Sequence, residues 1–277
     1  MDSLVSTQWL AEHLGEPDLV VVDSSWHMPA TGRNGREEYL AAHIPGARFL
    51  DIDELADRQN PAPHTLPSAE AFGEAMERLG IGREDRIVVY DNSPLRTAAR
   101  GWFMLRHMGA DRVAILDGGF QSWLAESRPT ESGEPAPREA TFAAAEQRDQ
   151  LVTKPQILAG IQAPLLDARS RPRFEGSEPD PRPGVAPGHI PGARNLPFAA
   201  LYKDDGRFRS PDEIRRLFDE ARIDPEQPFV ATCGSGVTAN SLIFAAHLLG
   251  NRTAQLYDGS WSEWGADPST PKEKGAA

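Results

Sequence analysis

The segment His-Ile-Pro-Gly-Ala-Arg occurs twice in this chain of 277 residues, at His43–Arg48 and again at His189–Arg194. Chance produces a six-residue identity in a chain of this length with odds on the order of one in a thousand, so the pair indicates an internal repeat. The spacing between the copies is too long for the units of a solenoid, and it is typical of two tandem domains.

The same order of features surrounds each copy. An apolar run that ends in Asp comes first, a second apolar run follows the copy, and a glycine turn follows that. These features lie at Leu19–Asp23, Ile87–Asp91 and Asp117–Phe120 in the first half, and at Pro164–Asp167, Phe229–Cys233 and Asp258–Trp261 in the second. Equivalent positions are 141 to 146 residues apart, so only short insertions separate the halves.

Helical patterns alternate with these short apolar runs. The predicted helices lie at Ser68–Leu79, Ala98–His107, Pro211–Ala221 and Val237–Leu249. Strands that alternate with helices predict a parallel sheet with helices on both faces. We therefore expect an α/β protein with two tandem domains, each built on a mainly parallel sheet.

A stretch rich in Pro, Glu, Ala and Arg lies between the halves, from Glu126 to Gln150. This composition is typical of a linker. The predicted division is an N-terminal domain over residues 1–135, a linker over residues 136–150 and a C-terminal domain over residues 151–277.

The charge balance of the chain limits the classes of partner that we expect it to bind. The chain has 29 basic and 41 acidic side chains and a net charge of -12. This argues against binding to nucleic acid and against adsorption to anionic membranes. No apolar run approaches the roughly 18 residues of a membrane span, and the start of the chain lacks the pattern of a signal peptide. We therefore expect a cytoplasmic protein.

The chain has one cysteine, Cys233. One thiol forms no internal disulfide and no cysteine-rich zinc site, and the histidines lack the spacing of metal ligands. His43 and His189 occur in both halves and are predicted to serve the shared fold. Trp261 and Trp264 are predicted to be core or interface aromatics.

The residues around the cysteine read Cys233-Gly234-Ser235-Gly236-Val237-Thr238 and lie between a predicted strand and a predicted helix. Such a strand places the thiol at the carboxyl edge of a parallel sheet, where α/β proteins bind ligands. The glycines permit a tight turn of backbone amides, and the helix adds its positive end, so the loop suits an anionic thiolate or a sulfur adduct. The alternative is a buried structural thiol.

The repeat, the paired His-Ile-Pro-Gly-Ala segments, the glycine turns and the cysteine loop resemble the two-domain rhodanese sulfurtransferases. The resemblance covers nearly the whole chain, and it implies two rhodanese-like domains of which only the second carries the catalytic cysteine. Asp91 stands at the position in the first half that matches Cys233.

The cysteine loop distinguishes two branches of this family. Thiosulfate-type members carry Cys-Arg-Lys-Gly, whereas this loop resembles that of the 3-mercaptopyruvate sulfurtransferases. The resemblance implies that Gly234, Gly236, Val237 and Thr238 line the substrate. Two cations beside the cysteine suit the small dianion thiosulfate, whereas mercaptopyruvate needs a carboxylate clamp and a proton donor.

Two arginines match the family's carboxylate clamp. Arg173 and Arg182 lie in a stretch rich in Pro, Gly and Arg, and the resemblance implies that they grip the carboxylate and keto group of the donor. Guanidinium suits this role because it binds a carboxylate with two hydrogen bonds and stays charged. The alternative is that they are solvated loop arginines or partners of Asp180 and Glu178.

The resemblance also implies a proton relay like that of serine proteases. Asp53 would orient His64, and His64 would exchange a proton with Ser235 to help protonate the departing enolate. The alternative is an ordinary loop histidine and a capping aspartate.

Together these features predict a sulfurtransferase that needs no cofactor. The Cys233 thiolate would take sulfur from 3-mercaptopyruvate, release pyruvate and pass the sulfur to cyanide, a small thiol or thioredoxin. One alternative is thiosulfate:cyanide transfer, and another is a non-enzymatic sulfur-relay module. A cysteine phosphatase is excluded because it requires Arg six residues after the cysteine, where this chain has Ala239.

Overall fold

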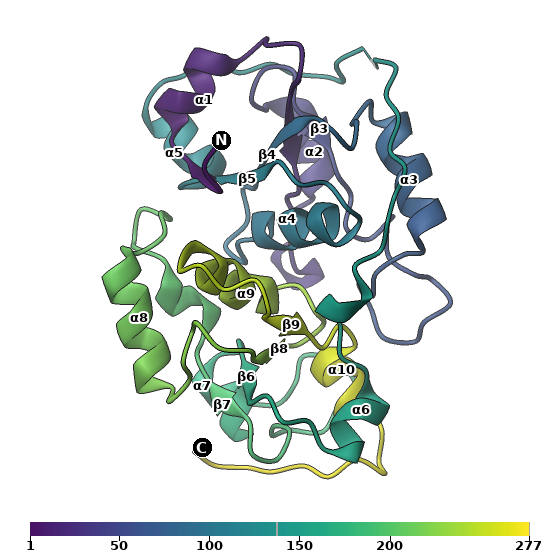
Figure 1. Ribbon diagram of the computed structural model, residues 1–277, viewed down its shortest axis with the longest axis vertical. Coiled ribbons are helices and arrows are strands. Elements are labelled where there is room, and N and C mark those ends of the chain that lie inside the picture. Colours follow the sequence, from purple (N-terminus) through teal and green to yellow (C-terminus); the bar gives the residue numbers. More distant parts are fainter. Residues whose placement is uncertain (137, 277) are drawn as a thin grey trace. The chain divides into compact units, whose positions relative to one another are not determined.

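The computed structural model describes residues 1–136 and 138–276 (Figure 1). The chain divides into two compact units. Unit 1 comprises Met1–Ala56, Pro67–Gln147 and Lys203–Phe208, and unit 2 comprises Asp57–Leu66, Arg148–Tyr202 and the chain from Arg209 onward. Each unit therefore contains most of one half of the repeat and a short segment from the other half.

Among the described residues of unit 1, five parallel strands form a sheet in the order β1-β5-β4-β2-β3. The strands are β1 (Leu4–Val5), β2 (Leu19–Asp23), β3 (Arg48–Phe49), β4 (Arg86–Tyr90) and β5 (Val113–Leu116). The helices are α1 (Thr7–His13), α2 (Gly35–Ala41), α3 (Ala69–Arg78), α4 (Ala98–His107), α5 (Gly119–Ala125) and the 3₁₀ helix η1 (Pro29–Thr31).

Helices cover both faces of this sheet. On one face α1, α2 and α5 supply Leu10, Tyr39, Phe120 and Trp123 to an apolar cluster. Val88 of β4 belongs to the same cluster, and the next residue, Val89, points to the opposite face. There α4 approaches so closely that a Cβ on Gly101 would lie 3.0 Å from Val89 Cγ1.

Unit 2 repeats this architecture with four parallel strands among its described residues, in the order β7-β6-β8-β9. The strands are β6 (Leu165–Asp167), β7 (Arg194–Asn195), β8 (Val230–Thr232) and β9 (Gln255–Leu256). The helices are α6 (Lys154–Ala159), α7 (Arg171–Glu175), α8 (Pro211–Glu220), α9 (Ala239–Leu248), α10 (Ser260–Trp264) and the 3₁₀ helices η2 (Arg148–Gln150) and η3 (Phe198–Leu201).

One face of the second sheet carries α6, α7 and α10, which contribute Ile157, Phe174, Trp261 and Trp264 to a buried cluster with Val230 of β8. Helix α9 contacts β8 and β9 on the other face. The predicted α/β class, with two parallel sheets covered by helices, is therefore confirmed. Trp261 and Trp264 are core residues, as one of their two predicted roles required.

The repeated hexapeptide forms the same turn in both units. Nδ1 of His43 and of His189 lies 2.8 Å from the carbonyl oxygen of an aromatic residue in the preceding helix, and each imidazole stacks on that residue's ring. The backbone of each histidine pairs with a glutamate near the end of its unit, Glu131 or Glu273. The identical segments therefore serve the fold, as predicted.

Part of the predicted linker 136–150 packs on unit 1. Phe142 is buried edge-on against Phe72, and the amide of Gln147 donates to the carbonyl of His107. Phe142 is the only large apolar side chain of this stretch, so its composition does not predict the packing. The chain passes from unit 1 to unit 2 after Gln147. The predicted domain limits stay a prediction.

Within the described residues, the helices are too short or too polar to cross a membrane.

The aspartates that end β2 and β6 differ in their partners. Asp23 and Asp167 each accept a hydrogen bond from the amide two residues later, at 2.8 and 2.9 Å. Asp167 also forms a buried ion pair with the Arg169 guanidinium, whereas position 25 is a serine. Both aspartates therefore anchor the backbone of the loop that follows them. Burial raises the pKa of Asp23 to about 7.

Replacing Asp23 by Asn should flatten the pH dependence of stability. Because the pKa of Asp23 is about 4 in the unfolded chain and about 7 in the folded one, the folded state holds this proton more tightly. Its contribution to stability is therefore present at low pH and is lost as pH rises through 7. Urea unfolding should therefore be measured from pH 5 to 8. The free energy of unfolding of the variant, relative to that of the wild type, should increase as pH rises. Parallel profiles would contradict this assignment.

Asp167→Asn supplies the matched control. This change removes one partner of a buried ion pair, so it should destabilise the protein at pH 8, by about 3–5 kcal/mol.

Candidate active site

Cys233 follows directly after β8, and its side chain is buried with 1% exposure. The residues after it turn back into α9, which begins at Ala239. The predicted arrangement of strand, cysteine loop and helix is therefore present. It places the thiol at the carboxyl edge of the sheet of unit 2.

The turn at Asp258–Trp261 holds the cysteine loop by backbone contacts. The amide of Cys233 donates to Ser260 Oγ at 3.1 Å, and the carbonyl of Cys233 accepts from the amide of Trp261 at 3.0 Å. The backbone of Gly236 also lies close to this turn. Its φ is +74°, and a Cβ at this position would lie 2.6 Å from the carbonyl oxygen of Asp258. The duplicated glycine turn therefore supports the loop.

The side chain of Asn240 supports the loop from the helix side. Its Nδ2 donates to the carbonyls of Gly236 and Val237, at 2.6 and 2.9 Å. Thr238 occupies the N-cap position of the helix without a capping hydrogen bond from its side chain. Within the described residues, the amides of Gly234, Ser235, Val237 and Thr238 donate to no acceptor. The carbonyls of the loop are thus turned outward to donors, and these amides are left for an anion.

Unit 1 shows an anion in the equivalent loop. Asp91 stands where unit 2 has Cys233, and its two carboxylate oxygens accept from the amides of Ser93 and Ala98, at 2.8 and 2.7 Å. Ala98 is the first residue of the following helix, as Ala239 is in unit 2. The duplicated loop therefore binds a negative group, which supports the same role for the loop around Cys233.

Both predicted clamp arginines reach the cysteine loop. Arg182 Nη1 donates to the carbonyl of Gly234 at 2.7 Å. A Cβ on Gly234 would lie 2.6 Å from Arg182 Nη2 and 3.3 Å from Arg173 Nη2. The absence of a side chain at position 234 is therefore what allows two guanidinium groups to lie against the loop.

Asp180 holds the same two arginines. Its buried carboxylate accepts from Arg173 Nη2 at 2.7 Å and from the amide of Arg182 at 3.0 Å, and it lies 3.7 Å from Arg182 Nε. The two arginines are thus partners of Asp180 as well as neighbours of Gly234. Arg173 Nε is buried without an acceptor among the described residues, so it remains a donor for a ligand oxygen.

Burial dominates the electrostatics of Arg182. It lowers the pKa of the guanidinium, while the carboxylate of Asp180 and the thiol of Cys233 act in the opposite direction. A cation held in a partly buried site interacts more strongly with an anion than it would in water. Arg182 is therefore placed to bind a negative group beside Cys233.

His64 and Ser235 form one contact of the predicted relay. His64 Nδ1 lies 2.8 Å from Ser235 Oγ, within hydrogen-bond distance. His64 has a φ of +62°, and the amide of Leu66 donates to Asp258 Oδ2 at 2.7 Å. The segment Asp57–Leu66 is thereby fixed to the turn that also supports the cysteine loop.

Asp53, the third member of the predicted relay, lies in unit 1. Its Oδ2 accepts from the indole Nε1 of Trp26 at 2.8 Å, and its amide donates to Asp51 Oδ1 at 2.9 Å. The pairing of Asp53 with His64 stays a prediction.

A comparison with known protein families shows which family this chain belongs to. The model of the rhodanese-like domain matches the chain twice, over residues 6–126 and 145–267. The chain belongs to the rhodanese family.

Several rhodanese-family relatives cover nearly the whole chain. The 3-mercaptopyruvate sulfurtransferase of Homo sapiens is 44% identical over 271 residues, which are 95% of this chain and 91% of that protein. The thiosulfate sulfurtransferase of Rattus norvegicus is 41% identical over 285 residues, which are 99% of this chain and 96% of that protein.

A solved structure agrees with this assignment. The crystal structure of SseA from Escherichia coli, described as a 3-mercaptopyruvate sulfotransferase, matches with a TM-score of 0.86 and 36% identity. The match covers 95% of this chain and 100% of SseA.

Three supporting residues of this rhodanese-family site were not found by sequence reasoning as site residues. They are Asp180, Asn240 and Ser260, which act through contacts to arginines or to backbone atoms of the loop. Asp180 entered the sequence argument only as a competing partner of the arginines. Its position between Arg173 and Arg182 is the signal that could have revealed it.

Gly234→Ala should impair activity while leaving the fold intact. The added Cβ meets the far end of Arg182, a flexible side chain that can move away, so the clamp shifts rather than the backbone. Displacing a positioning group by about 1 Å can cost up to about 100-fold in rate, so we expect kcat/KM with mercaptopyruvate to fall about 10- to 100-fold. Steady-state kinetics and thermal melts measure the two effects.

Gly236→Ala provides the contrast within the same loop. Its Cβ would meet the backbone of Asp258 at a positive φ, so this change should lower stability by about 1–3 kcal/mol. Equal stability of the two variants, or full activity of Gly234→Ala, would contradict the assignment.

Proposed function

We propose that this protein is a 3-mercaptopyruvate sulfurtransferase that carries sulfur on Cys233. The observation that carries the proposal is the approach of Arg173 and Arg182 to a glycine at position 234, directly after the buried cysteine. The loop leaves no room there for the arginine of a Cys-Arg-Lys-Gly sequence, and it supplies the cations from outside the loop instead.

The arginines bind the donor's carboxylate and keto oxygens in this proposal. Arg173 offers Nε, which has no acceptor among the residues that the structure describes. Arg182 offers the guanidinium nitrogens that do not donate to the carbonyl of Gly234. Asp180 contacts both guanidinium groups and holds them at a fixed spacing. The donor thiol is thereby presented to Cys233.

The first half-reaction forms one sulfur–sulfur bond and breaks one carbon–sulfur bond. The Cys233 thiolate attacks the thiol sulfur of mercaptopyruvate, and the electron pair of the carbon–sulfur bond passes to the carbon as the enolate of pyruvate. One proton then converts the enolate into pyruvate, and Cys233 is left as a persulfide. Four loop amides, those of Gly234, Ser235, Val237 and Thr238, have no acceptor among the described residues. These amides would stabilise the persulfide.

His64 and Ser235 supply the proton in this proposal. Their 2.8 Å contact allows Ser235 to donate its hydroxyl proton to the enolate, while His64 supplies a proton to Ser235 in return. Asp53 would fix the orientation of His64. In the second half-reaction an acceptor thiolate, thioredoxin or cyanide attacks the outer sulfur and regenerates the Cys233 thiolate.

Thiosulfate is the alternative donor, because relatives with both activities in their names are similar to this chain. Purified protein should be assayed with each donor and cyanide as acceptor. We expect kcat/KM to be larger with mercaptopyruvate, and pyruvate to appear in equal amount to thiocyanate. A larger kcat/KM with thiosulfate would overturn the choice of donor, and absence of pyruvate would favour a sulfur-relay module.

We also place this activity in the cytoplasm. A single reactive thiol without a resolving cysteine suits a reducing compartment, where small thiols are available as acceptors. A relative from Arabidopsis thaliana is named as mitochondrial, so fractionation of cells that express the tagged protein tests this point.

A further inference from the structure

A cavity recurs at the same place in both units, although neither copy includes Cys233, Arg173 or Arg182. Each lies beside the edge strand that begins at the last residue of the repeated hexapeptide, β3 or β7, and between the two neighbouring helices. In both units the cavity is lined by three arginines. They are Arg36, Arg48 and Arg78 in unit 1, and Arg171, Arg194 and Arg222 in unit 2.

The cations in unit 1 are satisfied by the chain itself. Arg36 forms an ion pair with Glu134, and Arg48 Nη1 donates to the carbonyl of Pro135 at 2.9 Å. Arg78 lies 3.8 Å from Glu74 on its own helix. The copy in unit 1 therefore carries its own negative group.

The copy in unit 2 lacks this compensation. The residue three positions after the paired glutamate is Glu134 in unit 1 but Ala276 in unit 2. Within the described residues, Arg171, Arg194 and Arg222 form neither an ion pair nor a side-chain hydrogen bond. Glu175 and Glu220 also line this cavity, but among the described residues neither forms an ion pair with one of the three arginines. Three arginines thus line one cavity without an ion-pair partner, in a protein whose net charge is -12.

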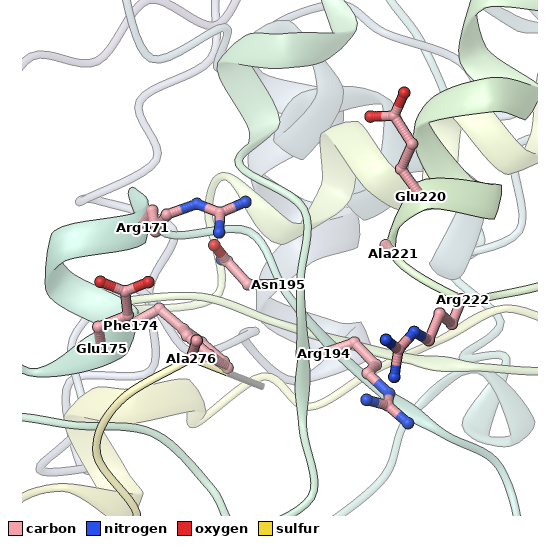
Figure 2. Close-up of a pocket in the computed structure, with 9 residues that line it drawn as sticks. All are labelled: Arg171, Phe174, Glu175, Arg194, Asn195, Glu220, Ala221, Arg222 and Ala276. Carbon is pink, nitrogen blue, oxygen red and sulfur yellow. The ribbon is translucent and has the colours of Figure 1, made fainter.

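Two of the three arginines face each other, while the guanidinium of Arg171 is directed toward Asn195 (Figure 2). Figure 2 shows the guanidinium groups of Arg194 and Arg222 directed toward one another, while the carboxylate of Glu220 points away from them. Like charges that face each other repel, and an anion between them converts this repulsion into attraction. Arginine is also the side chain best suited to the planar, paired recognition of oxyanions.

We propose that Arg171, Arg194 and Arg222 form a binding site for a compact oxyanion of the phosphate type, either free or as the terminal group of a small metabolite. The cavity volume of about 140 Å³ corresponds to roughly four or five water molecules, so it fits a small anion rather than a large ligand. The proposal is independent of the sulfur chemistry, because it uses none of the residues assigned to it.

Isothermal titration of the full-length protein with inorganic phosphate at low ionic strength tests the site. We expect one phosphate per chain, with an affinity that falls as chloride is added, because exposed charges are screened by salt. Arg194→Gln should weaken binding about tenfold, since one charge-assisted hydrogen bond is lost. Ala276→Glu should abolish binding, because it places in unit 2 the carboxylate that unit 1 has at Glu134.

Two controls locate the bound phosphate. Arg48→Gln changes the arginine of unit 1 that matches Arg194, and Arg182→Gln changes the candidate active site. Both variants should bind phosphate with the affinity of the wild type. Circular dichroism and thermal melts confirm that each variant is folded before titration.

A second titration with a phosphomonoester distinguishes the two sources of the anion. Tighter binding of the ester than of phosphate would identify a terminal group of a metabolite, and binding of phosphate alone would identify the free ion. The proposal is overturned if neither ligand binds, if Arg194→Gln and Ala276→Glu bind as well as the wild type, or if Arg182→Gln loses binding.

Discussion

Cys233→Ser should abolish sulfur transfer, with a loss of at least about 1,000-fold in kcat. The hydroxyl is a much weaker nucleophile than a thiolate at neutral pH, and no other thiol in the chain can replace it because Cys233 is the only cysteine. The loss should appear with every sulfur donor, since both half-reactions pass through this atom. Thiocyanate formation from each donor measures it.

The fold of this variant should be intact. Serine is close to cysteine in size, and the side chain lies in a loop whose backbone is held by Ser260 and Trp261. The far-ultraviolet circular dichroism spectrum and the melting temperature should therefore stay close to those of the wild type. A folded Cys233→Ser protein that still transfers sulfur at the original rate would refute the role of this residue.

Removing either clamp arginine should have the next largest effect. Arg173→Gln or Arg182→Gln removes a charged donor from a partly buried site, and hydrogen bonds to charged groups are worth about 1.5–3 kcal/mol each. With two such bonds lost, kcat/KM with mercaptopyruvate should fall about 100- to 10,000-fold, mainly through a higher KM. Steady-state kinetics with mercaptopyruvate measures this change.

Arg171→Gln is the matched control for this pair. Arg171 lies on the same short helix as Arg173, two residues earlier, but it lines the cavity of the proposed oxyanion site instead. Its replacement should leave kcat/KM close to that of the wild type. If Arg173→Gln and Arg171→Gln behave alike, the loss reflects damage to the helix, and the clamp assignment fails.

The fold could be predicted from sequence because each half of the repeat carries local signals that act independently. Leu19–Asp23 and Ala98–His107 were predicted with the limits of β2 and α4, since short apolar runs and helical periodicity determine these elements locally. Helix α9 begins at Ala239, two residues later than predicted, because the loop amides extend through Thr238. Those two residues belong to the cysteine loop rather than to the helix.

The site was less accessible to sequence reasoning because its contacts join distant parts of the chain. The two interpretations of Arg173 and Arg182, as clamp or as partners of Asp180, were treated as alternatives. The structure supports contacts of both kinds, because a guanidinium has five donors and can bind Asp180 while it also faces Gly234. The support from Asn240 and Ser260 depends on side-chain contacts to the backbone, which no motif encodes.

A single-turnover experiment tests the central claim most directly. Wild-type protein is mixed with mercaptopyruvate in the absence of an acceptor, and released pyruvate is measured together with the mass of the Cys233 peptide. The proposed mechanism predicts one pyruvate per chain and a mass increase of one sulfur atom on Cys233. Release of pyruvate without added sulfur on Cys233, or sulfur bound at another residue, would contradict it.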